Sequence, residues 1–251
     1  MTKAGKEASE TLDDLLLGGL KVFQPKSGYR FSIDAVLLAH FPRLDGVSHA
    51  IDLGTGNGVI PLLLSCRKPS LRITGIEIQP EMVKRARKSV SYNDLEERIT
   101  IKYLDIRAIP GQLERAQADL ITSNPPFWKA GEGKLNKNRE IAAARHEITV
   151  TLSDIIEAAA HLLKEGGRLA IIHRAERCQE LQQECVRRGF HITRLRMVQS
   201  FAGQKAKLVL VEACQGRGPA VSYQEPPLII YQAAGVYSPE VMAIYDNRMD
   251  K

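Results

Sequence analysis

Short apolar runs alternate with amphipathic segments along most of this chain, and the alternation limits the folds that it can adopt. Segments with helical periodicity, such as the one from Pro80 to about Asn93, separate the runs. Strands that alternate with helices predict an α/β fold with a doubly wound, mostly parallel sheet and right-handed crossovers. The runs with the composition of buried strands are residues 49–53, 71–76, 99–104, 118–123 and 168–172.

The alternation stops near the end of the pattern. Two strand-like runs, Ile192 to Val198 and Lys207 to Ala213, have only a short polar connection between them. Strands joined so closely pair antiparallel, so we expect a seven-stranded sheet that ends in a C-terminal antiparallel hairpin.

Three further elements are predicted from local patterns. Leu15 to Leu17 and Leu20 to Phe23, separated by two glycines, indicate an N-terminal hairpin. Ser32 is a suitable N-cap for a helix from Ile33 to Ala39. A helix from about Ser153 to Leu163 is expected to stop at Gly166 and Gly167.

A glycine-rich turn follows the first core strand. Glycines at alternating positions allow a sharp change from strand to helix and a close approach of the backbone to a ligand. The spacing differs from the dinucleotide-binding fingerprint, and the consecutive Lys-Ser/Thr pair of a phosphate-binding P-loop is absent from this turn. The segment comprises Asp52, Leu53, Gly54, Thr55, Gly56, Asn57 and Gly58.

Acidic residues end the next two strand-like runs. Glu77 stands where a carboxylate can accept hydrogen bonds from both ribose hydroxyls of a nucleoside cofactor. Asp105 ends the run from Ile99 to Leu104 and could meet the amino group of an adenine. Taken singly, each acid also fits a solvated charge at a strand end.

Asn124-Pro125-Pro126-Phe127 follows the apolar run from Ala118 to Ser123. Two prolines prevent the strand from continuing and make the turn stiff. The Asn124 carboxamide and the Pro125 carbonyl would then point in fixed directions beside an aromatic ring. This is a suitable site for a flat group that bears an amine, although such tetrapeptides are also common in rigid loops.

The ordered series of glycine turn, Glu77, Asp105 and Asn-Pro-Pro-Phe resembles class I S-adenosylmethionine-dependent methyltransferases that modify exocyclic or side-chain amide nitrogens. The resemblance implies a Rossmann-like fold, S-adenosyl-L-methionine as cofactor, and Asn124, Pro125, Pro126 and Phe127 as catalytic residues. It implies cofactor contacts by Asp52, Glu77, Asp105, Asn124 and the glycine turn.

Flanking segments are similar to bacterial enzymes that methylate adenine in a valine transfer RNA. The similarity lies in residues 23–34 and 143–147, and the match spans about residues 24–213. It adds Gln24, Tyr29, Arg30 and Phe31 as cofactor-binding candidates. It favours an RNA substrate, with transfer RNA preferred.

A basic segment follows the Asn-Pro-Pro turn and is well placed to hold a polyanion, although it also fits a solvated linker. The net charge of +6 permits nucleic-acid binding without requiring it. Trp128 could widen the surface on which a base stacks, and His146 fits a structural role as well as a catalytic one. The substrate-binding candidates are Trp128, Lys129, Lys134, Lys137, Arg139 and Arg145.

With the resemblance, we expect one globular unit in three parts. Residues 1–45 would cover the cofactor site, 46–215 would form the methyltransferase domain, and 216–251 would form a tail that could add an edge strand. No apolar run approaches the ~20 residues that span a bilayer, and a secretory leader pattern is absent, so no membrane association and a cytoplasmic location are expected. The four cysteines lack metal-binding spacing, and no metal is expected. The sequence leaves the oligomeric state open.

Three alternatives remain open at this point. A protein glutamine methyltransferase uses the same Asn-Pro-Pro logic, usually followed by Tyr and preceded by a large helical domain. A ribosomal RNA guanine methyltransferase shares Asn-Pro-Pro-Phe but often has His at the position of Trp128. A non-catalytic RNA-binding module could retain the fold, although the intact motifs argue against it.

Overall fold

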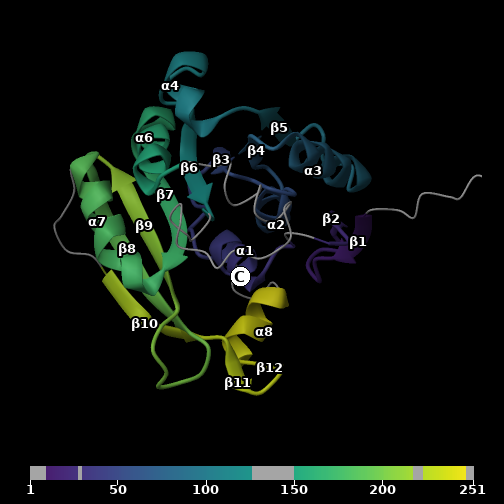
Figure 1. Ribbon diagram of the computed structural model, residues 1–251, viewed down its shortest axis with the longest axis vertical. Coiled ribbons are helices and arrows are strands. Elements are labelled where there is room, and N and C mark those ends of the chain that lie inside the picture. The colour runs from purple at the N-terminus through teal and green to yellow at the C-terminus, as the bar shows by residue number, and fades with distance from the viewer. Residues whose placement is uncertain (1–9, 28–29, 126–149, 217–222, 247–251) are drawn as a thin grey trace, which may run out of the picture.

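A single eight-stranded sheet forms the centre of the computed structural model, which describes residues 10–27, 30–125, 150–216 and 223–246 (Figure 1). The strand order is β10-β8-β9-β7-β6-β3-β4-β5, and β9 alone runs antiparallel to its neighbours in the sheet. The expected seven-stranded, mostly parallel sheet with its antiparallel hairpin is confirmed, and the tail adds the eighth strand. The strands are β3 (His49–Leu53), β4 (Arg72–Glu77), β5 (Ile99–Tyr103), β6 (Ala118–Ser123), β7 (Leu163–Arg174), β8 (Phe190–Gln199), β9 (Leu208–Gln215) and β10 (Tyr223–Ile229).

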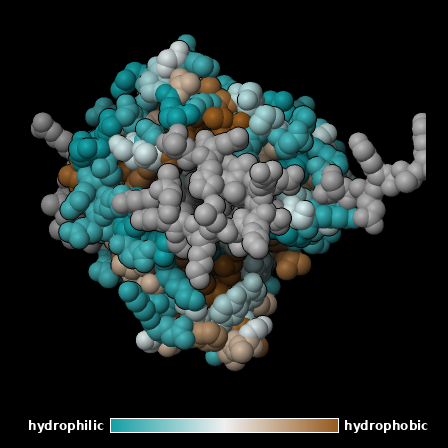
Figure 2. Space-filling view, viewed as in Figure 1, coloured by the Kyte–Doolittle hydropathy of each residue, from teal (hydrophilic) through white to brown (hydrophobic). Residues whose placement is uncertain are grey.

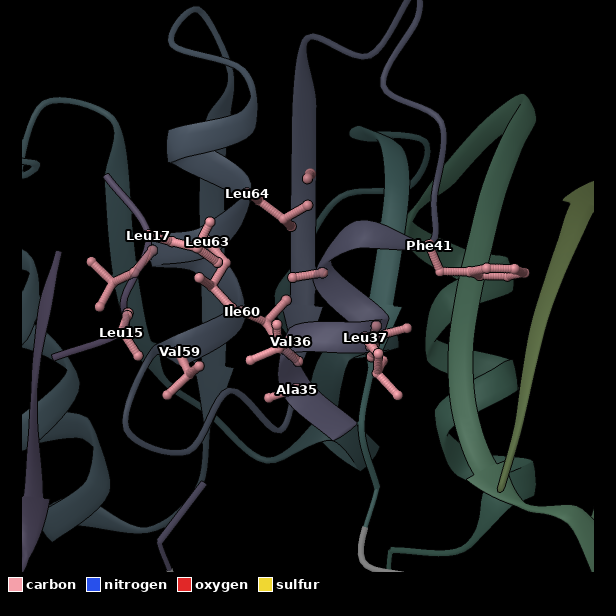
Figure 3. Close-up of a cluster of buried hydrophobic side chains, with 14 of the residues drawn as sticks. Leu15, Leu17, Ala35, Val36, Leu37, Phe41, Val59, Ile60, Leu63 and Leu64 are labelled. Carbon is pink, nitrogen blue, oxygen red and sulfur yellow. The ribbon is translucent and has the colours of Figure 1, made fainter. Parts of the chain in front are cut away.

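Helices cover both faces of this sheet, so two separate apolar cores form. One core lies between the sheet and α1 (Ile33–His40), α2 (Val59–Arg67), α3 (Pro80–Tyr92) and α8 (Pro239–Tyr245) (Figure 3). The other lies under η1 (Ile106–Ala108), α4 (Ile109–Gln112), α6 (Leu152–Leu162) and α7 (Cys178–Arg187), which follows η2 (Ala175–Arg177). Because the strands between these layers are buried on both faces, their sequences are continuous apolar runs and do not alternate between apolar and polar residues.

β3 lies at the point where the strand order reverses. The chain proceeds from β3 to β4 and β5 on one side, and then returns to β6 on the other side of β3. In open α/β sheets, ligands bind outside the carboxyl ends of the strands at such a switch point. The topology therefore predicts a ligand site at the segments that follow β3, β4 and β6.

An N-terminal hairpin of β1 (Glu10–Asp14) and β2 (Lys21–Pro25) packs against α3. The backbone N–H groups of Lys21 and Phe23 donate to the side chains of Asn93 and Ser89 at 3.0 and 2.9 Å. The expected first strand at residues 15–17 is wrong. Leu15 and Leu17 are each 2% exposed and sit in the connecting turn, where they join the core.

The two glycines expected to stop α6 lie inside strand β7 instead. The helix ends at Leu162, and Leu163 already has extended backbone angles. The pairing of β6 with β7 shifts register between the pairs Ala118–Leu163 and Leu120–Arg168, and Gly166 has a positive φ of 75°. The glycines therefore lie at an irregularity in the strand. A strand irregularity, like a helix end, favours glycine because glycine adopts positive φ angles without strain.

The C-terminal tail is part of the core. The edge strand that the tail adds is β10, which starts at Tyr223 and passes Pro226 and Pro227 at a shift in register beside β8. An edge strand tolerates prolines because one side of it needs no ladder partner. Short strands β11 (Tyr231–Ala233) and β12 (Val236–Tyr237) then lead into α8.

Ion pairs reinforce this attachment. Arg194 of β8 pairs with Glu225 of β10 at 2.8 Å, and Arg196 pairs with Glu240 of α8 at 2.6 Å. The two arginine side chains are only 13% and 14% exposed, so their charges need these partners.

Within the described ranges, no helix is long and apolar enough to cross a membrane.

Candidate active site

The carboxyl ends of β3, β4 and β6 lie side by side. Leu53 of β3 is in register with Ile76 of β4 on one side and with Ser123 of β6 on the other. The backbone N–H groups of Gly54 and Thr55 donate to the Ile76 carbonyl at 2.9 and 3.0 Å, and the Ser123 hydroxyl donates to the Leu53 carbonyl at 2.9 Å. The glycine turn is thus anchored on both sides to the strands that carry Glu77 and Asn124.

Three glycines of this turn have backbone angles that favour glycine. Gly54, Gly56 and Gly58 have φ values of 75°, 56° and 85°. A Cβ on Gly58 would lie 3.3 Å from the Cβ of Ala86, so this glycine lets α3 pack closely. No described atom lies within 4 Å of a Cβ built on Gly54. The first glycine therefore faces space in which a ligand can approach the backbone.

Asp52 is a buried acid directly before the turn. It is 0% exposed, and one carboxylate oxygen, Oδ1, accepts a hydrogen bond from the Thr122 hydroxyl at 2.7 Å. Burial raises the pKa of Asp52 to about 6, and the side chains of Thr122 and Thr55 oppose that rise. Apart from this interaction between Asp52 and Thr55, neither Oδ2 of Asp52 nor the Thr55 hydroxyl has a hydrogen-bond partner among the described residues. Buried oxygens with so few partners are rare, and these retain capacity for a ligand donor.

Gly75 makes room for this arrangement. It lies opposite Asp52 in the pairing of β3 with β4. A Cβ at Gly75 would lie 2.8 Å from Cγ2 and 2.9 Å from Oγ1 of Thr55, and 2.9 Å from Cδ1 of Ile101. A side chain at this position would push Thr55 out of place.

Glu77 is buried and held by the backbone. Its Oε2 accepts from the N–H of Gly56, and its Oε1 accepts from those of Ile78 and Gln79, all at 2.9 Å. Burial raises the pKa of Glu77 despite these three hydrogen bonds. Because Oε2 receives a single donor from the described part of the chain, it retains capacity for a ligand hydroxyl.

Asn57 and Asp105 are engaged by arginines in this structure. The Asn57 Oδ1 accepts from Arg85 at 3.0 Å, and Asn57 is 3% exposed. The Asp105 carboxylate accepts from the Arg107 side chain at 2.5 to 3.1 Å and from its backbone N–H at 2.9 Å. These contacts hold the pKa of Asp105 below its usual value.

Asn124 and Pro125 follow directly on β6, with Asn124 partly buried and Pro125 buried. Their strand pairs with β3, so the turn begins beside the glycine loop. The remaining candidates of this turn and of the basic segment lie outside the described residues, as does Tyr29. They are Pro126, Phe127, Trp128, Lys129, Lys134, Lys137, Arg139 and Arg145, together with His146.

The N-terminal candidates form a second hydrogen-bonded group. Gln24 is 1% exposed, donates to Asp13, and accepts from the Phe31 N–H at 2.8 Å. Arg30 also donates to Asp13 and, at 3.0 Å, to Thr11. These contacts tie the hairpin to the chain that enters α1.

Two residues of this region were not singled out from the sequence. Thr122 donates a hydrogen bond to Asp52, and Gly75 leaves space for the side chain of Thr55. Thr122 could have been noticed as a polar residue at the buried end of an apolar strand. Its partner, however, depends on the strand order, which local patterns do not specify.

Known proteins resemble this chain in sequence. The model of the family "Methyltransferase small domain" matches residues 33–194. A tRNA1(Val) (adenine(37)-N6)-methyltransferase of Porphyromonas gingivalis is 33% identical over 225 residues, which cover 86% of each chain. A protein of the same name from Tolumonas auensis is 28% identical, covering 89% of this chain and 91% of that protein.

Solved structures resemble it in fold. A predicted O-methyltransferase of Agrobacterium tumefaciens has a TM-score of 0.67 and 22% identity, covering 86% of this chain and 96% of the other. TYW2 of P. horikoshii, solved with MeSAdo, has a TM-score of 0.58 and 15% identity, covering 82% and 71%. At these identities the likeness shows the fold alone.

Proposed function

The chain belongs to the methyltransferase small domain family and is a methyltransferase, and from this we propose that it methylates the N6 amino group of an adenine in transfer RNA with S-adenosylmethionine. The observation that carries the proposal is the position of Asn124, which follows β6 directly beside the glycine turn of β3. The relatives named as adenine-N6 methyltransferases support the choice of adenine.

The residues around the turn fit the cofactor. Two buried oxygens, Asp52 Oδ2 and Thr55 Oγ1, have no hydrogen-bond partner in the described structure beyond the interaction between these two side chains. The space beside Gly54 contains no described atom within 4 Å of a built Cβ. Glu77 offers a carboxylate that suits ribose hydroxyls. We assign these residues to cofactor binding, and the cofactor supplies a methyl group on a positively charged sulfur.

The acceptor side must solve a different problem. The lone pair of an exocyclic amine is delocalised into the base, so the amine is a poor nucleophile until it is oriented. Asn124 Oδ1 and the Pro125 carbonyl would each accept a hydrogen bond from the amine and so direct its lone pair toward the methyl group. The N–C bond would form as the C–S bond breaks, and the methylated amine would then lose one proton to solvent. Orientation of this kind contributes much of the rate in bimolecular transfers. Phe127 would stack on the base, which offsets the cost of unstacking it.

We also propose that the N-terminal segment helps to cover the cofactor. The hairpin is fixed to α3 by Asn93 and Ser89, and α3 follows β4, which carries Glu77. Gln24 and Arg30 both hold Asp13, and Gln24 also fixes Phe31. Asp105 and Asn57 accept hydrogen bonds from Arg107 and Arg85. To bind the cofactor through the same oxygens, they would have to release these arginines.

The test is to incubate the protein with labelled S-adenosylmethionine and, separately, transfer RNA, ribosomal RNA and release factor. Digestion of the product RNA to nucleosides identifies the modified base. The proposal expects label in transfer RNA as N6-methyladenosine. Label in guanine, or only in release factor, would overturn it in favour of a guanine or a glutamine methyltransferase.

A further inference from the structure

The connection between β8 and β9 lies at the same edge of the sheet as Asn124. β7 is parallel to β6, β9 is antiparallel to β7, and β8 is antiparallel to β9. The carboxyl end of β8 and the start of β9 therefore share an edge with the end of β6. With strands about 4.8 Å apart, the start of β9 lies two strand spacings, or about 10 Å, to the side of Asn124.

This connection, residues 200–207, is an ordered segment. The N–H of Gln204 donates to the Phe201 carbonyl at 3.2 Å, and Gly203 has a φ of 77°, as a tight turn requires. The tail supports it from one side, because the N–H of Tyr231 donates to the Ser200 carbonyl at 2.9 Å. In Figure 1, the segment runs beside β11 and β12.

Aromatic rings form a continuous row from this turn. The Phe201 ring lies 5.7 Å from Tyr231, which stacks on Tyr237 at 5.3 Å, and Tyr237 stacks on Tyr245 at 5.6 Å. Phe201 is at the end of the row and is partly exposed. The row fixes its orientation, so a planar ligand would meet a rigid ring.

Two lysines follow the same turn. Lys205 and Lys207 are exposed, and their ammonium groups have no ion-pair partner among the described residues. The arginines at and after the end of β7 differ, since Arg174 and Arg177 pair with Glu176 and Glu180 at 2.8 and 2.6 Å. On the face in Figure 2, the described surface is mostly hydrophilic, and hydrophobic side chains gather only in small groups.

We propose that Phe201, Lys205 and Lys207 form a docking surface for the RNA strand next to the target base, with Phe201 stacking on a base and the lysines contacting phosphates. A partly exposed ring near two lysines that lack ion-pair partners among the described residues matches the chemistry of single-stranded RNA, which combines π-faces with a charged backbone. Lys207 directly precedes β9 and so lies about 10 Å to the side of β6, and Phe201 follows β8, one strand spacing further away. These offsets suit nucleotides that flank the modified one. This inference rests on the proposed function, because it places an RNA base at Asn124.

The test compares two double variants of equal charge. Lys205→Gln/Lys207→Gln removes the proposed contacts. Arg43→Gln/Arg115→Gln removes two exposed cations that have no ion-pair partner among the described residues, from segments that precede β3 and β6 at the opposite edge. We expect the lysine variant to raise the KM for RNA about tenfold, and to reduce the slope of log binding constant against log salt by about 1.4. The control should match the wild type, and the cofactor Kd should not change in either variant.

Phe201 is tested separately. Phe201→Ala should raise the RNA KM about fivefold to a hundredfold, whereas Phe201→Tyr, which keeps the ring, should behave like the wild type. If wild-type protein methylates RNA but the lysine variant equals its arginine control and Phe201→Ala has no effect, the docking surface is wrong and the proposed function stands. If wild-type protein methylates only release factor, both are wrong.

Discussion

Thr122 on β6 donates a hydrogen bond of 2.7 Å to the buried carboxylate of Asp52 on β3. The two residues are directly opposite each other in the register of these strands. The contact therefore joins the strand that ends in the acceptor turn to the strand that ends in the glycine turn. It also determines which oxygen of Asp52 remains available for a ligand.

Replacing Thr122 by Val should remove this donor while keeping the shape of the side chain. A buried acceptor left without a donor costs about 1–3 kcal/mol, and the pKa of Asp52 should rise above its value of about 6. We expect the variant to unfold at a lower urea concentration and to bind the cofactor more weakly at pH 7. Cofactor binding should recover as the pH is raised, because Asp52 then ionises. Thr122→Ser keeps the hydroxyl and should restore both, so a serine variant as weak as the valine variant would refute the role of the hydrogen bond.

Asp52→Asn should make stability less dependent on pH. The pKa of Asp52 is raised from 3.8 to about 6 in the folded protein, so the folded state holds the proton more tightly than the unfolded state. Ionisation then lowers the stability as the pH rises through this window, by on the order of 3 kcal/mol. The variant should melt close to wild type near pH 4 and at a higher temperature at pH 7.5, with weaker cofactor binding. Equal melting temperatures at pH 7.5 would contradict this account.

Gly75→Ala should damage the glycine turn from the neighbouring strand. Its Cβ would approach Thr55 to 2.8 Å, and overpacking of this kind costs about 1–3 kcal/mol. Urea unfolding and cofactor titration measure the two effects. Gly111→Ala is the control, because no described atom lies within 4 Å of its Cβ and Gly111 lies in α4. Equal stability of the two variants would show that the space beside Gly75 is not needed.

The sequence predicted the sheet and the main motifs because both depend on local patterns. Apolar runs identify strands, and the glycine turn, Glu77 and Asn124 each stand at the end of one. Strand pairing is not local, so the contact between Thr122 and Asp52 was not foreseen. The composition around Leu15 and Leu17 predicts a strand, whereas these leucines lie in the turn between β1 and β2 with their side chains buried in the core. Gly166 and Gly167 predict a helix end, but glycine is equally suited to an irregularity within a strand.

Glu77→Gln tests whether this carboxylate holds the turn as well as the cofactor. Its two oxygens accept hydrogen bonds from three backbone N–H groups. In glutamine, the NH2 group would replace one oxygen and face at least one of these N–H donors. We expect the cofactor Kd to rise at least tenfold in calorimetry, with a smaller loss of thermal stability. Glu81→Gln on α3 is the control, since Glu81 is exposed and pairs only with Lys84 among the described residues. A cofactor Kd as unaffected as that of the control would exclude Glu77 from the site.

The most direct test of the central claim is the Asn124→Ala variant, measured for methyl transfer to transfer RNA and for cofactor binding by calorimetry. Asn124 begins the turn beside the glycine loop, and we assign it to the orientation of the amine rather than to the cofactor alone. The account predicts that turnover falls at least about 100-fold while the cofactor Kd changes by less than about threefold. Unchanged turnover, or a loss of cofactor binding large enough to explain the whole defect, would contradict it.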